Sequence, residues 1–143
     1  MKTLWIIGGP TASGKTSLGI DLAMGLQTEV LSADARQFYR GMDIGTAKPS
    51  APELSSVKHH FINSLDLNED YDVADYERDA LLQLDAIFKT SDHAIMVGGS
   101  GLFIQAVLYG LSPMPSVTED IRKKWRKIEA SDDLESLQKA LED

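Results

Sequence analysis

The 143-residue sequence contains no cysteine. This absence excludes disulfide bonds, thiolate metal sites and a cysteine nucleophile, and it favours a reducing compartment, so we expect a cytoplasmic protein. Basic residues are also few, because 14 Lys and Arg stand against 22 Asp and Glu and the formal net charge is −8. The acidic balance argues against broad, sequence-independent binding of nucleic acid, which needs clustered cations to neutralise phosphates. Any nucleic-acid contact therefore depends on a local basic face.

Long hydrophobic runs are missing as well. The longest strongly apolar stretch, residues 102–111, is interrupted by Gln105 and Gly110. It is far shorter than the ~20 residues of a membrane span. The apolar residues near the amino terminus are too few for a secretory signal peptide. We therefore expect an ordinary globular protein without membrane association, in agreement with its 43% hydrophobic and 25% charged residues.

Three short apolar runs, residues 4–7, 29–33 and 94–97, are typical of strands covered on both faces. Helices are predicted from residue 15 to about residue 26, where Leu18 and Leu22 repeat at helical spacing, over residues 71–89 with Asp72 as N-cap, and over residues 100–111. Residues 46–57 have the proline, serine and alanine content of a mobile surface loop. The order of elements predicts an α/β fold with a parallel sheet flanked by helices.

The chain divides into residues 1–115, an expected catalytic core, and residues 116–143, a strongly charged segment with a helical pattern. The second part includes the basic run 122–127, which either contacts nucleic acid or forms a solvated helix face. Its helical pattern ends without a glycine cap or a closing strand. We therefore expect this segment to begin a further region of a longer protein.

A phosphate-binding pattern, G-x-x-x-x-G-K-[ST], lies between the first predicted strand and the first predicted helix, which is the context that such a loop requires. Glycines allow successive backbone N–H groups to converge on an anion, and the amino terminus of the helix adds partial positive charge. Lys15 supplies a mobile ammonium, and Thr16 is placed to ligate magnesium. The pattern predicts a P-loop NTPase-like fold that binds a diphosphate or triphosphate through Gly9, Pro10, Thr11, Ala12, Ser13, Gly14, Lys15 and Thr16.

Asp34 is the carboxylate expected to face this loop. It follows the second predicted strand, and ligands of open parallel sheets bind beyond the carboxyl ends of the strands. The third predicted strand runs into glycines and serine without a carboxylate. Arginine, amide and ring side chains follow Asp34 and suit a nucleobase and its phosphates: Arg36, Gln37, Tyr39 and Arg40. The alternative reading of Asp34 is a helix cap or a surface ion pair.

Four motifs in order resemble the tRNA dimethylallyltransferase family. They are the phosphate-binding loop, residues 32–49 (SADARQFYRGMDIGTAKP), residues 59–62 (HHFI) and residues 97–103 (VGGSGLF). The similarity extends from Ile7 to about Pro115. It implies transfer of a dimethylallyl group from dimethylallyl diphosphate to the exocyclic N6 amine of the adenosine 3′ of the tRNA anticodon.

The resemblance also implies roles for individual residues. Lys15 and Thr16 are expected to stabilise the diphosphate leaving group together with Mg²⁺, and Asp34 is expected to accept the proton of the amine. The residues expected to contact tRNA are Asp34, Ala35, Arg36, Gln37, Ser100 and Arg122. Ser100 and Phe103 stand where members of the family commonly have threonine and tyrosine. Family chains are substantially longer, so we expect this chain, as a monomer, to keep the phosphate loop and to catalyse poorly or not at all.

Other functions remain open at this stage. A small P-loop kinase needs an arginine-rich lid, and Arg78 is the only arginine between residues 72 and 113. An adenylate isopentenyltransferase would act on free nucleotides, and a non-catalytic remnant would only bind its ligands. His59 and His60 suggest a metal site only weakly, because no further ligand stands at a suitable spacing. The basic run 122–127 and the cations Arg36, Arg40 and Lys48 are expected to steer any polyanion.

Overall fold

A computed structural model describes residues 1–112, 117–131, 135 and 138–139. Its internal contacts divide the chain into two compact units, Met1–Leu111 and Ser112–Asp143. Residues 113–116, where the sequence predicts a proline-rich break after the last core helix, lie outside the described residues.

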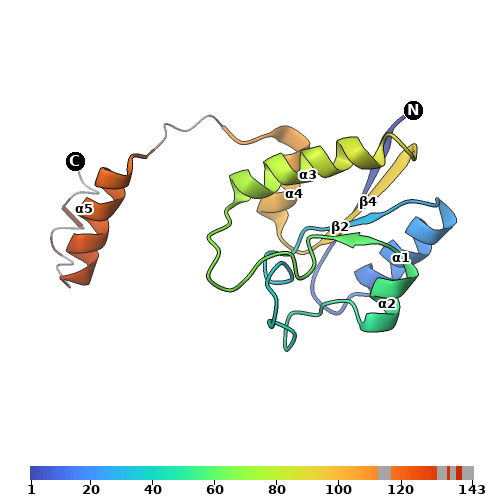
Figure 1. Cartoon of the computed structure of the whole chain (residues 1–143), viewed down its shortest axis with the longest axis horizontal. Helices are drawn as coiled ribbons and strands as arrows, with labels where there is room; N and C mark the ends of the chain where they lie inside the picture. Colours follow the sequence, from blue (N-terminus) through green and yellow to red (C-terminus); the bar gives the residue numbers. More distant parts are fainter. Residues whose placement is uncertain (113–116, 132–134, 136–137, 140–143) are drawn as a thin grey trace. The chain divides into compact units, whose positions relative to one another are not determined.

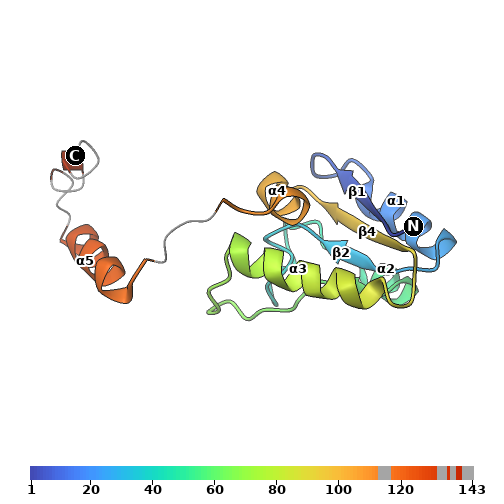
Figure 2. The same cartoon turned by 90° about the horizontal axis from the view of Figure 1, so that it is seen from above.

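The first unit is built on four parallel strands in the order β1-β4-β2-β3. Figure 1 shows β2 and β4, and Figure 2 shows β1 beside β4. Ile6 of β1 and Leu31 of β2 both lie opposite Met96 of β4, so β4 runs through the middle of the sheet. The elements are β1 (Thr3–Gly8), α1 (Lys15–Gly25), β2 (Val30–Ser32), α2 (Ala51–Ser56), β3 (His59–His60), α3 (Val73–Ile87), β4 (His93–Gly98) and α4 (Gly101–Tyr109). This arrangement confirms the predicted parallel α/β sheet.

Helices cover both faces of the sheet, with α3 and α4 on one side and α1 and α2 on the other (Figures 1 and 2). Successive residues of a strand point to opposite faces, so each strand feeds two cores. Leu31 and Met96 pack in the core beneath α3 and α4, whereas Val30 and Ile95 pack in the core beneath α1 and α2. Burial on both faces explains why β2 and β4 read as continuous apolar runs, whereas the edge strand β1 is only partly covered, since Trp5 is 45% exposed.

Helix α1 packs on the sheet through Ile20 and Ala23, with Leu22 partly buried against the same core, so of the predicted apolar positions Leu18 is the exception. Leu18 is half exposed, and the buried positions are Gly19, Ile20 and Ala23. A Cβ at Gly19 would lie only 2.5 Å from Cγ2 of Val97, so the missing side chain is what lets α1 approach β4. Hydrophobic periodicity cannot signal a contact that a glycine makes.

The prediction of a surface loop over residues 46–57 is wrong for most of that segment. Thr46 and Val57 are buried, and α2 occupies residues 51–56. The Glu53 side chain accepts hydrogen bonds from the Ser50 backbone N–H at 2.7 Å and from the Ser50 hydroxyl at 2.6 Å. This capping box is an S-x-x-E pattern, so the sequence does carry a signal for α2. The two-residue strand β3 carries no comparable signal, because pairing with β2 alone defines it.

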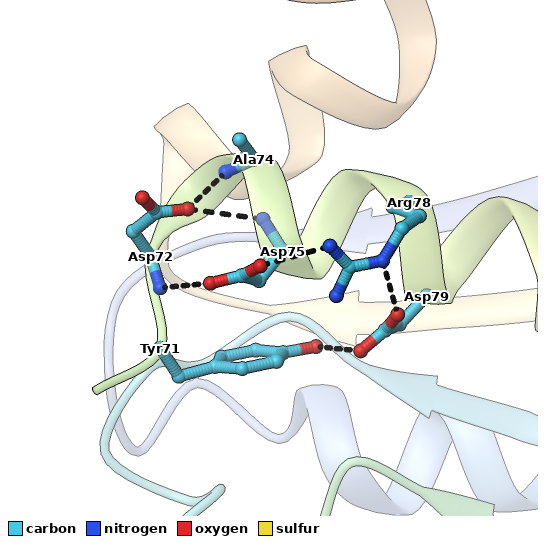
Figure 3. A network of polar contacts seen from close by, with 6 residues as sticks. All are labelled: Tyr71, Asp72, Ala74, Asp75, Arg78 and Asp79. Carbon is cyan, nitrogen blue, oxygen red and sulfur yellow. Dashed lines mark hydrogen bonds and ion pairs between the residues drawn. The ribbon is translucent and has the colours of Figure 1, made fainter. Parts of the chain in front are cut away.

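The amino terminus of α3 confirms Asp72 as its N-cap (Figure 3). One carboxylate oxygen of Asp72 accepts from the backbone N–H groups of Ala74 and Asp75 at 2.8 and 3.0 Å, and Asp75 accepts from the Asp72 N–H at 3.3 Å. Arg78 then pairs with both Asp75 and Asp79, at 2.9 and 3.0 Å. The first turn of α3 is therefore held by its own side chains.

An aromatic cluster connects α3 and α4 with the segment that follows β2. Phe38 and Tyr76 stack with ring centroids 5.3 Å apart, and both are almost fully buried. The Tyr76 hydroxyl donates to the backbone carbonyl of Ser32 at 2.9 Å, which fastens α3 to the end of β2. Further rings pack edge-on against this pair, from Phe61, Tyr71 and Phe103.

The second unit contains α5 (Glu119–Ala130). Acidic side chains in its first turn, Glu119 and Asp120, and Lys127 in its last turn have the charges that stabilise the helix dipole. Arg122 and Trp125 lie on one surface hollow of this unit, together with Val117, Arg126 and Glu129. No described helix of the chain combines the length and the apolar character that crossing a membrane requires.

Candidate functional site

A cavity of about 280 Å³ lies at the carboxyl ends of the strands in the first unit. Loops that follow β1, β2 and β4 meet there, which is where open parallel sheets bind ligands. Its lining consists of residues 11–17, Val30, Ser32, Asp34, Gln37, Ala47, Pro49, Glu53, His59, Ile62 and residues 97–99.

The glycine-rich loop forms one side of this cavity. Gly14 has a left-handed φ of 82° and accepts the first hydrogen bond of α1, from the Leu18 N–H at 3.1 Å. The Lys15 ammonium and the Ser13 hydroxyl both donate to the Pro10 carbonyl, at 2.5 and 2.8 Å. No side chain caps α1 in the described structure, so its first N–H groups are free to bind an anion.

Most of the predicted phosphate-binding residues line the cavity. Residues 11–16 do so, including Lys15 and Thr16, whereas Gly9 and Pro10 lie at the base of the loop and outside the lining. Gly9 approaches the glycines after β4, because a Cβ at Gly99 would lie 3.5 Å from the Gly9 carbonyl oxygen. Gly9 and Pro10 therefore belong to the loop but not to the lining of the cavity.

Asp34 lines the same cavity as Lys15 and Thr16, as its position after β2 predicts. Its Oδ1 atom also accepts from the Arg36 backbone N–H at 3.1 Å and lies 3.9 Å from the Arg36 Nε. Asp34 thus lines the cavity and also forms the ion pair of the alternative reading, with Arg36, whereas no helix begins at this residue.

The other residues predicted to contact tRNA lie around this turn or elsewhere. Ser100 accepts from the Ala35 N–H at 3.2 Å through its hydroxyl oxygen, and it lies outside the cavity lining. The Arg36 side chain is mostly exposed and also lies outside the lining. Arg122 belongs to the second unit, Ser112–Asp143.

Gln37 is engaged within the fold. Its amide nitrogen donates to the carbonyls of Thr46 and Ala47 at 3.1 and 3.0 Å, and its amide oxygen accepts from the Ser32 hydroxyl at 2.9 Å. Both amide hydrogens are therefore used by the protein itself. The residue reaches the cavity as part of its wall.

Sequence reasoning missed another part of the cavity lining, the wall that Ala47, Pro49, Glu53 and Ile62 form. His59, for which the sequence favours a structural or substrate-facing role, also lines it. The His59 Nδ1–H donates to the Val57 carbonyl at 2.8 Å, and burial lowers the pKa of this imidazole below its ordinary value, which favours the neutral ring. The pKa of Glu53 is lowered by the hydrogen bonds from Ser50, so the wall carries an ionised carboxylate.

The donor atoms around the loop suit a hard cation held by few protein ligands. The hydroxyl of Thr16 and the carboxylate of Asp34 line one cavity, and Mg²⁺ in phosphate sites takes one or two protein oxygens and completes its shell with phosphates and water. Across the described residues, no three His, Cys, Asp or Glu side chains form a group that could bind a metal ion.

Comparison with known proteins assigns the family. The IPP transferase family model matches residues 37–143. The chain belongs to the IPP transferase family. It is 47% identical to the tRNA dimethylallyltransferase of Flavobacterium johnsoniae over 122 residues, and this match covers 85% of the chain and 40% of the relative. It is 46% identical over 133 residues to the tRNA dimethylallyltransferase of Christiangramia forsetii, which covers 93% of the chain and 44% of that relative.

Solved structures agree with this assignment. The full-length tRNA isopentenylpyrophosphate transferase from Bacillus halodurans superposes with a TM-score of 0.75 at 37% identity, over 99% of this IPP transferase chain and 47% of that chain. A eukaryotic dimethylallyltransferase acting on tRNA superposes with the same TM-score at 27% identity, over 84% of the chain and 31% of that protein. The predicted family and the P-loop NTPase-like fold are confirmed, and the chain spans less than half the length of these relatives.

Proposed function

We propose that this chain supplies the donor-binding part of an enzyme that transfers a dimethylallyl group from dimethylallyl diphosphate to the N6 amine of the adenosine 3′ of the tRNA anticodon. The observation that carries the proposal is that one cavity is lined both by the phosphate-binding loop and by Asp34. A leaving group and a base are needed on either side of the reacting carbon, and this cavity provides for both.

On the donor side, the N–H groups of the loop and the Lys15 ammonium bind the diphosphate oxygens. Thr16 is the residue that would hold Mg²⁺, which supplies charge neutralisation of the diphosphate. As the bond between the allylic carbon and the diphosphate oxygen breaks, the negative charge that collects on the leaving group is stabilised by these groups.

On the acceptor side, the lone pair of the N6 amine forms the new carbon–nitrogen bond, and Asp34 accepts the proton that the nitrogen loses. The carboxylate atom Oδ1 is already bonded to the Arg36 N–H, which orients the group while leaving Oδ2 for the proton. In this proposal the tRNA is contacted by the turn of Asp34, Ala35 and Arg36, by Ser100, which accepts a hydrogen bond from that turn, and by Arg122 on α5. Gln37, also expected to contact tRNA, serves as part of the cavity wall, because its amide is used within the fold. The complete enzyme acts as a cytoplasmic monomer.

The relatives support this assignment over a kinase. They are tRNA dimethylallyltransferases and a tRNA isopentenylpyrophosphate transferase. A kinase lid needs free arginines, and Arg78, the only arginine between residues 72 and 113, pairs with Asp75 and Asp79 on its own helix. No arginine of that segment is therefore left to close over a nucleotide.

Titration calorimetry tests the proposal with the 143-residue chain, dimethylallyl diphosphate and Mg²⁺, beside ATP and Mg²⁺ in the same buffer. We expect the allylic diphosphate to bind and Lys15→Ala to weaken it by about tenfold or more, because a charge-assisted phosphate contact is lost. A matched control is Lys89→Ala, which removes an exposed lysine outside the cavity lining. Preference for ATP would favour the kinase, and equal binding by Lys15→Ala would remove Lys15 from the site.

A further inference from the structure

Lys48 is a nearly buried lysine beside the cavity. Its side chain is 6% exposed, and its ammonium donates to the Tyr39 carbonyl at 2.6 Å, to Asn63 Oδ1 at 2.6 Å and to Asp43 Oδ1 at 3.0 Å. An ammonium has three hydrogens to donate, and all three have acceptors here. The expectation that Lys48 steers a polyanion is therefore wrong, because its side chain is nearly buried and its ammonium is bound to three acceptors of the protein.

Gln37 binds the backbone of the two residues that precede Lys48. Its amide nitrogen binds the carbonyls of Thr46 and Ala47, and the buried Thr46 hydroxyl donates to the Met42 carbonyl at 2.7 Å. The loop of residues 39–49 is thus held by two side chains that together donate five hydrogen bonds, three from Lys48 and two from Gln37. We call these two side chains the Gln37–Lys48 anchor.

The anchor acts next to the cavity wall. Ala47 and Pro49, on either side of Lys48, both line the cavity, whereas Lys48 does not. Ala47 has a left-handed φ of 49°, a conformation that a residue with a Cβ adopts only when its surroundings impose it. The hydrogen bond from Gln37 to the Ala47 carbonyl is one such constraint. Ala47 and Pro49 are thus held in place by the polar side chains of Gln37 and Lys48.

We propose that Lys48 is a positioning residue, which with Gln37 fixes Ala47 and Pro49 in the wall of the cavity that the phosphate-binding loop also lines. A ligand that binds the loop through its phosphates and extends an apolar group to this wall is then held in one geometry. The identity of that ligand, an allylic diphosphate, rests on the proposed function, whereas the anchor itself does not.

The chemistry of the site predicts which substitutions fail. Methionine keeps the length of the side chain but leaves the acceptors of Tyr39, Asp43 and Asn63 without their donor. Arginine keeps the charge, but its planar fork cannot direct three donors to three acceptors that converge on one point. We therefore expect Lys48→Arg not to rescue what Lys48→Met loses.

Hydrogen exchange followed by mass spectrometry tests the anchor without any ligand. In Lys48→Met we expect amides of residues 39–48 to exchange about tenfold faster or more, while those of β4 and α3 change by less than about twofold. Lys89→Met is the matched control, because Lys89 is exposed and lies outside the cavity lining. Asp43→Ala removes one acceptor and gives a milder version should Lys48→Met fold poorly. Unchanged exchange in the loop, or equal acceleration throughout the sheet, would overturn the anchor.

Binding of two ligands then distinguishes a change in the cavity wall from a change in the phosphate-binding loop. Inorganic diphosphate needs only the loop, so Lys48→Met is expected to keep its affinity within about twofold, whereas dimethylallyl diphosphate is expected to bind about fivefold more weakly or worse. Equal changes for both ligands, or full rescue by Lys48→Arg, would overturn the positioning role. If the unmodified chain binds neither ligand, the donor site of the proposed function fails, and hydrogen exchange still decides whether the anchor exists.

Discussion

Gly98 at the end of β4 lies against the backbone of Ala33 at the end of β2. A Cβ at Gly98 would stand 2.1 Å from the Ala33 carbonyl oxygen and 2.8 Å from its Cα. The Ala33 N–H donates to the Val97 carbonyl at 2.8 Å, and the Ser100 N–H donates to the Ala33 carbonyl at 3.1 Å. Because Asp34 is the next residue, this close approach is what brings the carboxylate to the cavity.

Gly98→Ala is expected to destabilise the fold by about 3 kcal/mol or more, because the backbone that a methyl group would strike cannot rotate away as a side chain does. Denaturant unfolding followed by circular dichroism measures this change. Gly101→Ala is the matched control, since no atom lies within 4 Å of a Cβ there, and alanine favours the helix by about 1 kcal/mol or less. Similar stabilities for the two variants would contradict the close contact at Gly98.

Asp34→Asn is expected to remove transfer activity from the complete enzyme while donor binding stays within about twofold. The amide keeps the shape of the side chain but cannot accept the proton, and loss of a general base lowers rates by about 10²- to 10⁴-fold. Single-turnover transfer to tRNA and calorimetry with dimethylallyl diphosphate measure the two effects. Transfer that survives within a fewfold would show that Asp34 is not the base.

Glu29 makes the stability of the chain depend on acid. Its carboxylate lies 2.6 Å from the Nε2 of His60 and 3.1 Å from the Lys58 ammonium. Burial alone would raise the pKa of Glu29, but the hydrogen bonds from His60 and Lys58 outweigh it and lower the pKa below its ordinary value of 4.5. A carboxylate with a depressed pKa in the folded state stabilises the protein above the pKa of the unfolded chain.

The stabilisation by Glu29 is therefore expected in full above about pH 4.5 and is lost as the pH falls through the folded pKa. Free energies of unfolding measured between pH 6 and pH 3 are expected to fall less steeply in Glu29→Gln than in the unmodified chain. Asp85→Asn serves as the control, because Asp85 is exposed and forms no ion pair with any described residue. Parallel pH profiles for Glu29→Gln and the unmodified chain would refute the coupling.

Asp72→Ala is expected to cost about 1 kcal/mol, because two N–H groups of α3 lose their acceptor. Thermal unfolding would show a drop of a few degrees in Tm. Asp72→Ser keeps a capping oxygen and should lose only part of that stability. If the alanine variant were as stable as the serine variant, the cap shown in Figure 3 would contribute nothing.

Much of the fold follows from local patterns. The strands β1, β2 and β4, the cap at Asp72 and the phosphate-binding loop each depend on a few adjacent residues, and the sequence predicts them within one or two positions. The prediction of a loop over residues 46–57 misses α2, which covers just six residues, and the sequence gives no sign of β3, which exists only through pairing with β2. Short elements give too few repeats for periodicity to detect.

The candidate site divides in the same way. The donor loop and Asp34 were predictable, since a motif and the end of a strand announce them. The roles of Gln37 and Lys48 were not, because a polar side chain reads as a substrate contact until its partners are known. Their partners lie up to fifteen positions away along the chain, at Ser32, Tyr39, Thr46, Ala47 and Asn63.

The sequence by itself determined the family, the parallel α/β class and the phosphate-binding loop, because each is written in contiguous residues whose chemistry does not depend on distant neighbours. The tertiary structure decided which residues line the cavity and which keep its wall in place through hydrogen bonds. Gly19 and Gly98 permit close packing, and Lys48 is consumed by internal acceptors. Steric approach and hydrogen-bond satisfaction belong to pairs of residues brought together by folding, so no single stretch of sequence contains them.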